Sequence, residues 1–207
     1  MDRAAIEAEI LALVEKHLAA FETYPECRND PKTGHVARYT TEQGNRLTIA
    51  KYKGKGLSID QIRDYYANII KNAPLINPTY ELTKIAEDQG HNIYHNLAKV
   101  PWPVTNRSTL ACEYIREENG TYTYMATSKG CEHMVESQAK LIGKNVLALQ
   151  IVLWEHYKPC EDGLEITCVT CVDPAGSLPN FLKNHQADHH ADAPKDIANF
   201  LQKGHAK

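Results

Sequence analysis

The chain has 207 residues, of which 43% are hydrophobic and 24% charged, and its formal net charge is −3. This length suits one domain with a substantial core, and the composition is ordinary for a water-soluble globular protein. The small negative charge and the lack of a basic block exclude nucleic acid as an expected partner. The amphipathic first twenty residues do not read as a signal peptide, and no apolar run is long enough to span a membrane. We therefore expect one cytoplasmic domain over residues 1–207.

Six cysteines are too few for a dense disulfide framework in a chain of 207 residues, so we expect free thiols. Cys168 and Cys171 have the C-x-x-C spacing of some zinc and redox sites. They lie in a β-branched stretch that predicts a strand, where residues three apart point to opposite faces. We therefore expect no metal or redox pair there.

The first third of the chain predicts two helices and a hairpin. An apolar stripe from Ala5 to Phe21 predicts a helix of about five turns that ends before Pro25. Two short strands, His35–Thr40 and Arg46–Tyr52, flank a Gln-Gly-Asn turn. Ser58 followed by Gln61 fits a capping box, and the helix that it begins ends near Pro74.

The middle of the chain predicts six further strands. They are Tyr80–Ala86, Asn92–Lys99, Arg107–Arg116, Thr121–Ser128, Asn145–Tyr157 and Leu164–Val172. Several joints are two- or three-residue turns ending in glycine, and short joints connect antiparallel neighbours. An antiparallel sheet of this many strands tends to curl.

Two segments interrupt this β pattern. The connection Lys129–Lys144 is long and carries apolar residues, and long loops in compact domains are often functional. After Asp173–Pro179, apolar side chains recur on one face of a helix from Leu178 to Leu201. One helix cannot fill a curled sheet, so we expect an α+β fold with a cavity between the two.

Two motifs carry a family resemblance. Val-Pro-Trp-Pro-Val-Thr-Asn-Arg at residues 100–107 enters a strand, and Val-Asp-Pro-Ala-Gly-Ser-Leu-Pro-Asn-Phe-Leu at residues 172–182 enters the last helix. Both resemble signatures of StAR-related lipid-transfer (START) domains, with Ser108 in place of the usual Asp. The order of elements matches over essentially the whole chain.

The resemblance implies a helix-grip fold, shared with Bet v 1-like proteins, in which a curled antiparallel sheet grips the last helix around a hydrophobic tunnel. It implies non-catalytic binding and intracellular transfer of one sterol, neutral lipid or phospholipid, transient membrane contact and no cofactor. We expect a monomer. The last helix and the long loop would form the gate, through the apolar loop residues Met134, Val135, Leu141 and Ile142.

Strand alternation and this resemblance together predict the tunnel lining. The predicted residues are Tyr94, Asn96, Thr109, Ala111, Glu113, Ile115, Met125, Leu149, Ile151, Phe181, Leu182 and His185. Glu113 stands where relatives that bind sterol or phosphatidylcholine have a basic residue. Pointing inward, it would favour a hydroxyl or an amine on the ligand; pointing outward, it would pair with a neighbouring Lys or Arg. Arg107 is expected to tie its strand to a neighbouring loop.

Other functions stay open at this level. An enzyme or ligand-gated regulator of the same fold could use the cavity for a small aromatic molecule, and a collapsed tunnel would leave a pure interaction module. No nucleophile–histidine or paired-carboxylate spacing supports catalysis. His185 and His189, four residues apart, with His190 and two nearby aspartates, suggest a metal site. Nothing supplies a third inward ligand, so we expect no metal.

Overall fold

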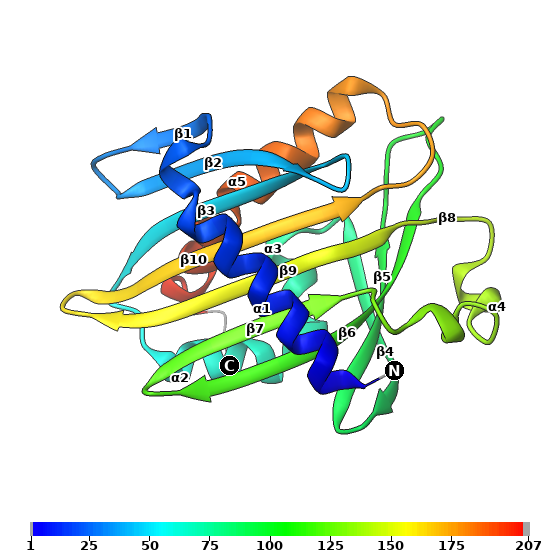
Figure 1. The fold of residues 1–207 in the computed structure, drawn as a ribbon, viewed down its shortest axis with the longest axis horizontal. Helices are drawn as coiled ribbons and strands as arrows, with labels where there is room; N and C mark the ends of the chain where they lie inside the picture. The colour runs from blue at the N-terminus through cyan, green and yellow to red at the C-terminus, as the bar shows by residue number, and fades with distance from the viewer. Residues whose placement is uncertain (1, 205–207) are drawn as a thin grey trace.

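The computed structural model describes residues 2–204 (Figure 1). The longer helices are α1 (Arg3–Ala19), α2 (Ile59–Ala67), α3 (Ile69–Ile76), α4 (Ala139–Ile142) and α5 (Asn180–Gln202), with short helices η1 (Phe21–Thr23) and η2 (Glu132–Met134). The strands are β1 (Glu26–Asp30), β2 (His35–Glu42), β3 (Asn45–Lys55), β4 (Tyr80–Asp88), β5 (His91–Ala98), β6 (Arg107–Glu118), β7 (Thr121–Thr127), β8 (Val146–Leu147), β9 (Leu149–Cys160) and β10 (Gly163–Asp173).

The strands form one sheet in the order β1-β2-β3-β10-β9-β7-β6-β5-β4, with the short β8 beside β6. Every pair along this path is antiparallel, and among the strands of residues 2–204 only the β6–β8 pair is parallel. Three hairpins close through two-residue turns, Gln43-Gly44, Gln89-Gly90 and Asn119-Gly120, and both residues of each turn have positive φ. Glycine takes this conformation without a Cβ clash, as type I′ turns require. The tight antiparallel joints predicted from the sequence are thus confirmed.

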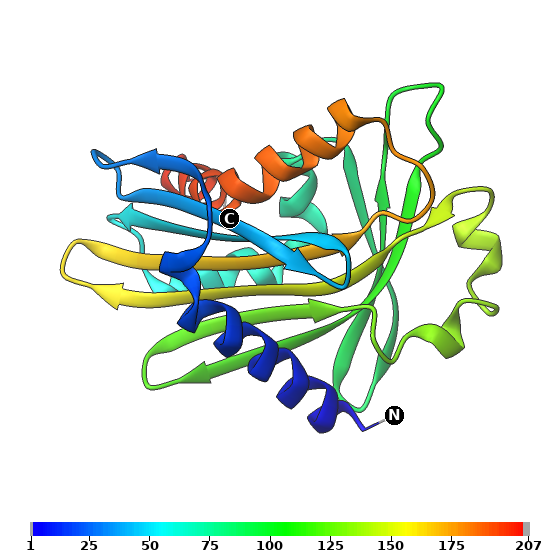
Figure 2. The same ribbon diagram turned by 45° about the horizontal axis from the view of Figure 1, so that its top comes forward.

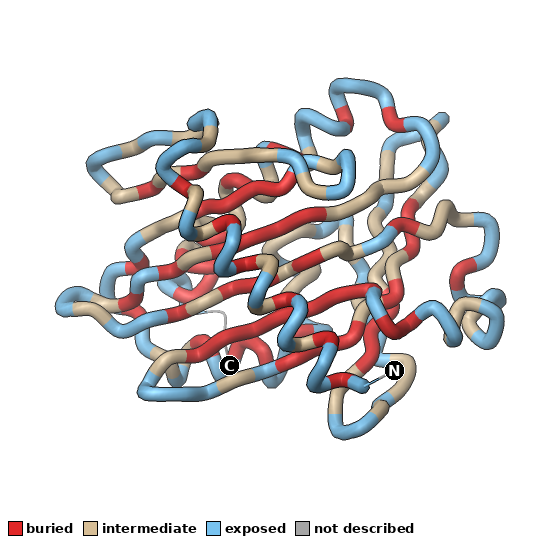
Figure 3. The backbone as a smooth tube through the Cα atoms, viewed as in Figure 1, coloured by how far each residue is buried: buried red, intermediate tan, exposed pale blue. Residues whose placement is uncertain are grey.

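Helices cover both faces of the sheet. In Figures 1 and 2, α1 crosses one face, while α5, α2 and α3 lie on the other. The strand stretches beneath α1 are largely buried (Figure 3). The predicted α+β fold, a large antiparallel sheet with a long C-terminal helix packed on it, is confirmed.

Aliphatic and sulfur-containing side chains fill the space between α1 and the sheet. Ile6, Ile10 and Val14 of α1 pack in one cluster with strand residues that include Met125 and Trp154. All five are at most 8% exposed. We call the whole buried set, which also includes Ile142 from the connection after β7, the α1 cluster.

A second cluster lies on the opposite face, between α2, the end of α5 and the sheet. It is rich in tyrosine: Tyr65, Tyr66, Tyr122, Tyr124 and Tyr157 all belong to it. The ring of Tyr66 stacks on Tyr124 at 4.2 Å and on Tyr122 at 5.5 Å between centroids. We call this set the tyrosine cluster.

Some element boundaries differ from the sequence predictions. The second predicted helix is two helices that meet at Asn68, and Pro74 lies inside the latter rather than ending it. Strand β1 was not predicted, and the predicted strand Asn145–Tyr157 is divided into β8 and β9. The predicted loop Lys129–Lys144 contains η2 and α4. The six cysteines are free, and Cys168 and Cys171 belong to clusters on opposite faces of the sheet, as expected.

Candidate ligand-binding cavity

A cavity of about 410 Å³ lies between the sheet and the first half of α5. Its volume falls in the range of small-molecule and cofactor sites. Strands β4, β5, β6, β7, β9 and β10 supply the floor, and α2, α3 and α5 supply the remaining walls. The concave face is therefore not packed solid, which counts against the collapsed-tunnel alternative.

Small side chains leave this space open. Thr109 and Ala111 of β6, Ala126 of β7 and Ala148, the residue before β9, point into the cavity. Alternate residues of the same strands, such as Met125 between Tyr124 and Ala126, point to the α1 cluster instead. The sequence thus places bulky residues on one face of the sheet and many small residues on the other.

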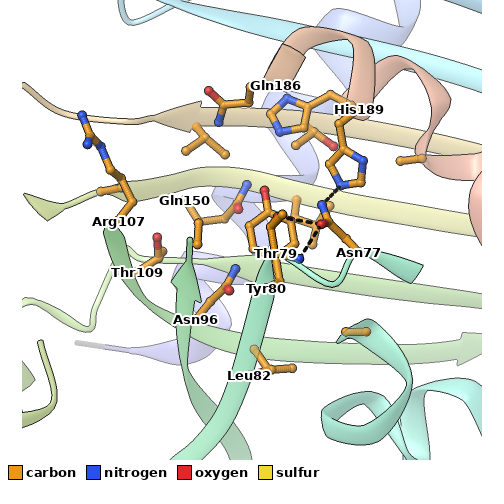
Figure 4. A pocket seen from close by; sticks show the side chains of 18 of the residues that line it. Asn77, Thr79, Tyr80, Leu82, Asn96, Arg107, Thr109, Gln150, Gln186 and His189 are labelled. Carbon is orange, nitrogen blue, oxygen red and sulfur yellow. Dashed lines mark hydrogen bonds between the residues drawn. The ribbon is translucent and has the colours of Figure 1, made fainter. Parts of the chain in front are cut away.

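Polar side chains line the end of the cavity near the β5–β6 connection (Figure 4). Asn77 Nδ2 lies 3.1 Å from His189 Nε2, so α3 and α5 meet across the cavity rim. Burial lowers the pKa of His189, which favours its neutral form. Gln150 and Asn96 project from the floor nearby.

Arg107 ties the start of β6 to the segment that leads into α5. Its guanidinium donates to the carbonyls of Pro174 at 3.2 Å and Ala175 at 3.4 Å, and also to that of Thr105. This confirms the structural tie expected from the sequence. Arg107 also borders the cavity, at the same end as the β5–β6 connection.

Glu155 lies at the opposite end of the cavity, where the floor meets the tyrosine cluster. It is 6% exposed, and its Oε2 accepts hydrogen bonds from the hydroxyls of Tyr157, at 3.0 Å, and Tyr66. The two hydroxyls are 2.8 Å apart. Burial raises the pKa of Glu155 to about 7, and the Tyr157 hydrogen bond opposes that rise.

Six of the twelve predicted lining residues border the cavity. They are Tyr94, Asn96, Thr109, Ala111, Leu182 and His185. Their part in lipid binding remains a prediction, and the other six lie elsewhere.

For two of these six residues, Leu149 and Ile151, the prediction is wrong because of a β-bulge. Between Cys171 and Val172 the pairing of β10 with β9 skips Ile151, so Gln150 and not Ile151 faces the cavity. Ile151 packs against the α1 cluster, and Leu149 is 44% exposed. Alternation counted through the bulge reverses the face of every residue before it, and a single sequence does not reveal the bulge.

The other four fail for separate reasons. Met125 lies in the α1 cluster because its neighbours Tyr124 and Ala126 take the cavity side. Ile115, which lies opposite Tyr124 in the β6–β7 pair, is 45% exposed and does not line the cavity. Phe181 is 64% exposed on α5, next to the inward Leu182.

Glu113 is buried but does not border the cavity. It lies on β6 two residues beyond Ala111, is 4% exposed, and accepts a hydrogen bond from Asn92 at 2.7 Å. Burial raises its pKa, with the Asn92 hydrogen bond acting in the opposite direction. It therefore neither faces water nor contributes to the cavity lining.

The loop predicted as the gate lies on the α1 side of the sheet, away from the cavity. Ile142 belongs to the α1 cluster, Met134 and Val135 pack against it, and Leu141 is 41% exposed. None of these four residues lines the cavity. The segments that border it instead are the β5–β6 connection at Lys99–Pro101 and the approach to α5 at Pro174 and Leu178.

The aspartates beside the α5 histidines have another partner. Arg28 of β1 contacts Asp188 at 2.6 Å and Asp192 at 3.3 Å, which fixes the middle of α5 to the sheet edge. Within residues 2–204, no three His, Cys, Asp or Glu side chains group as metal ligands do. No helix in the same range is long and apolar enough to cross a membrane.

Sequence reasoning missed Glu155, Gln150 and Tyr66 as cavity residues. For Glu155 a signal was present: it is the one carboxylate within the run Val152–Tyr157, whose other members are mostly apolar or aromatic. A charge inside such a strand indicates either a paired core residue or a site.

Comparison with known proteins supports the fold. No protein-family model and no curated protein matches the sequence. The structure of human StAR-related lipid transfer protein 5 superposes with a TM-score of 0.71 at 13% identity, over 99% of this chain and 100% of that one. Human STARD10 gives 0.67 at 16% identity, over 87% of this chain and 73% of that one.

A bacterial protein shares the same architecture. A STAR-related lipid transfer protein from Xanthomonas axonopodis matches with a TM-score of 0.63 at 17% identity, over 86% of this chain and 98% of that one. At identities this low, the superpositions establish the fold alone and do not identify the ligand. The chain has the fold of START domains, as the two sequence motifs indicate.

Proposed function

We propose that this protein binds one lipid molecule in the cavity under α5 and carries it between membranes without a chemical step. The observation that carries the proposal is the cavity of about 410 Å³, lined largely by alanine, leucine and tyrosine side chains, beneath the first half of α5. The START fold adds support, since the named structural relatives are lipid-transfer proteins. The free cysteines suit a cytoplasmic location.

The energetics of such a site are adequate for transport. Each methylene removed from water contributes about 0.8 kcal/mol, so a chain of a dozen methylenes contributes on the order of 10 kcal/mol. Part of this is lost in ordering the ligand and the helix that covers it. The surplus would hold a lipid that water does not dissolve, while permitting release at a membrane.

We propose that the β5–β6 connection meets the membrane. Trp102 in this connection is 92% exposed, and its neighbours Pro101 and Val100 line the cavity. Pro103 and Pro179 border one small hollow, so the connection lies beside the start of α5, where Phe181 is 64% exposed. Indole rings favour the interface between headgroups and acyl chains.

A catalytic role is the second candidate, because Glu155, Tyr66 and Tyr157 converge at one end of the cavity. A group with a pKa near neutrality could move a proton. The two functions differ in the ligand recovered: a carrier returns it unchanged, whereas an enzyme returns a product. Mass analysis of a lipid extract before and after incubation with the protein separates them.

The test of transfer uses two vesicle populations and a fluorescent phospholipid or sterol. Wild type should move the lipid between vesicles, and Trp102→Ala should slow transfer several-fold while leaving the affinity for Nile red unchanged. Leu141→Ala, at an exposed site on the other side of the sheet, is the matched control. If wild type transferred neither the phospholipid nor the sterol, the proposal would be rejected.

A further inference from the structure

The two ends of the cavity differ in their ionisable side chains. Lys99 and Arg107 border the end near the β5–β6 connection. Three histidines line the cavity from α5, and burial lowers the pKa of His189 and His190, which favours their neutral forms. Glu155, at the other end, is the one carboxylate among the described lining residues, so an elongated ligand would meet a carboxylate at that end alone.

The carboxyl of Glu155 has no cationic partner. Within residues 2–204 its hydrogen bonds come from Tyr66 and Tyr157, and no ion pair reaches it. Across the sheet it pairs with Tyr124 of β7 and Cys168 of β10, whose groups are neutral near neutral pH. A buried carboxylate without a cation is costly unless something else satisfies it.

Both tyrosine hydroxyls contact the same oxygen, Oε2. The other carboxyl oxygen, Oε1, is then the one that can accept a hydrogen bond from a ligand in the cavity. The ring of Tyr66 stacks on Tyr124 and meets Tyr157 edge-on, so the carboxyl is fixed in place before a ligand arrives. A preorganised acceptor of this kind loses little entropy on binding.

We propose that Glu155 is the specificity-determining residue of the cavity. It selects an apolar ligand that carries a hydrogen-bond donor, a hydroxyl or an ammonium group, at the end nearest Glu155. This inference rests on the proposed function. A ligand entering with a carboxylate or phosphate at that end would meet like charge in a poorly hydrated site and be rejected. Burial that raises the pKa of Glu155 to about 7 is consistent with a site completed by a donor.

Glu113 provides a control within the same protein. It is equally buried, on the same strand as three lining residues, and it accepts a hydrogen bond from Asn92. It does not border the cavity. A selectivity that depends on a carboxylate in the lining should respond to Glu155 and not to Glu113.

The experiment measures displacement of Nile red by three ligands with one alkyl chain: decylamine, decanol and decanoic acid, at about pH 8, where Glu155 is mostly ionised. In wild type, decylamine and decanol should bind about tenfold or more tighter than decanoic acid. Glu155→Gln should weaken decylamine about tenfold and strengthen decanoic acid, with a smaller effect on decanol because Gln still accepts a hydrogen bond. Glu113→Gln should keep the wild-type order.

Nile red affinity and circular dichroism show whether each variant keeps its cavity and fold. Glu155→Met, an apolar replacement that needs no partner, is the second variant and should lose the amine preference in the same way. An unchanged order of the three ligands in both folded variants would overturn this inference alone. Failure of all three ligands to displace Nile red from wild type would overturn the proposed function and the inference with it.

Discussion

The two faces of the sheet differ in how densely their side chains pack. Under α1, large side chains such as Ile10, Trp154 and Met125 interdigitate, and the space is filled. Under the first half of α5, the same strands present Ala111, Ala126 and other small residues, and a cavity of about 410 Å³ remains. Side chains of alternating size along one strand therefore make a core on one side and a container on the other.

The comparison extends to the helices. Helix α1 is held by burial of its apolar stripe, together with an ion pair between Arg3 and Asp88 at 2.7 Å. The second half of α5 is held in the same manner, by Ala191, Ile197 and Leu201, each at most 6% exposed. Its first half covers the cavity instead of a core, so it has fewer apolar contacts to lose on opening. Low local stability is what a ligand-admitting element needs.

Filling the cavity with a larger side chain should have the largest effect, a loss of ligand affinity. Ala111→Phe adds a ring to the cavity floor, and we expect the affinity for an apolar ligand such as Nile red to fall on the order of 100-fold or more, because the ring takes the ligand's place. Fluorescence titration measures it. Ala8→Phe, on the exposed side of α1, is the matched control and should bind as wild type does. Equal affinity in all three proteins would mean that ligand binds elsewhere.

Removing a side chain from the filled face should reduce stability and not affinity. Ile10→Ala deletes a residue that is 5% exposed in the α1 cluster, and should lower the free energy of unfolding by about 3 kcal/mol. Leu182→Ala, at the cavity wall, should lower it less, because Leu182 already adjoins empty space. Urea unfolding of the two variants gives the comparison. Equal losses would contradict the difference between the faces.

The charge of Glu155 should make stability depend on pH. Its folded pKa, about 7, lies above the ordinary value of 4.5, so the folded state binds more protons than the unfolded state between these values. Stability of the unliganded protein therefore falls as pH rises through this window, by on the order of 1–3 kcal/mol. Glu155→Gln should remove the loss, so its advantage over wild type should grow from about pH 5 to about pH 8.

Thermal unfolding of both proteins across that pH range measures this effect. Glu136→Gln, at an exposed position near η2, is the control and should show no such trend. An advantage of Glu155→Gln that stays constant with pH would mean that the carboxyl does not titrate in this window.

Releasing the middle of α5 should have the smallest effect on stability. Arg28→Ala removes the contacts to Asp188 and Asp192, which are partly exposed, so the loss should be about 1 kcal/mol or less. Hydrogen exchange of the backbone amides in residues 181–190 should quicken relative to those in residues 195–202. Equal change in both halves would contradict a separately opening first half.

Much of this fold could be predicted from the sequence, because it depends on local patterns. Glycine turns located the hairpins, the apolar stripe located α1, and the Asp-Pro-Ala-Gly break located the start of α5. What could not be predicted depends on long-range geometry. The bulge at Ile151 and the face that α1 covers follow from how strands and helices meet, and neither leaves a period in the sequence.

The sequence predicted that a cavity lies between the sheet and the last helix, but it predicted only some of the residues that line it. Alternation along β5 and β6 placed Asn96, Thr109 and Ala111 correctly because those strands are regular. The loop predicted as the gate does not border the cavity, because its apolar residues, such as Ile142, pack in or against the α1 cluster. Glu113 drew attention through the family resemblance, whereas the only sequence signal for Glu155 was its place in a mostly apolar strand, and the tertiary structure places it at the cavity.

Native mass spectrometry of protein purified from its host tests the central claim most directly. Wild type should carry one additional mass per chain, released as an apolar molecule on denaturation. Ala111→Phe, purified in the same way, should be folded and carry none. A wild-type protein without bound mass, or the same bound molecule on Ala111→Phe, would contradict the account of the cavity under α5 as a container for one lipid.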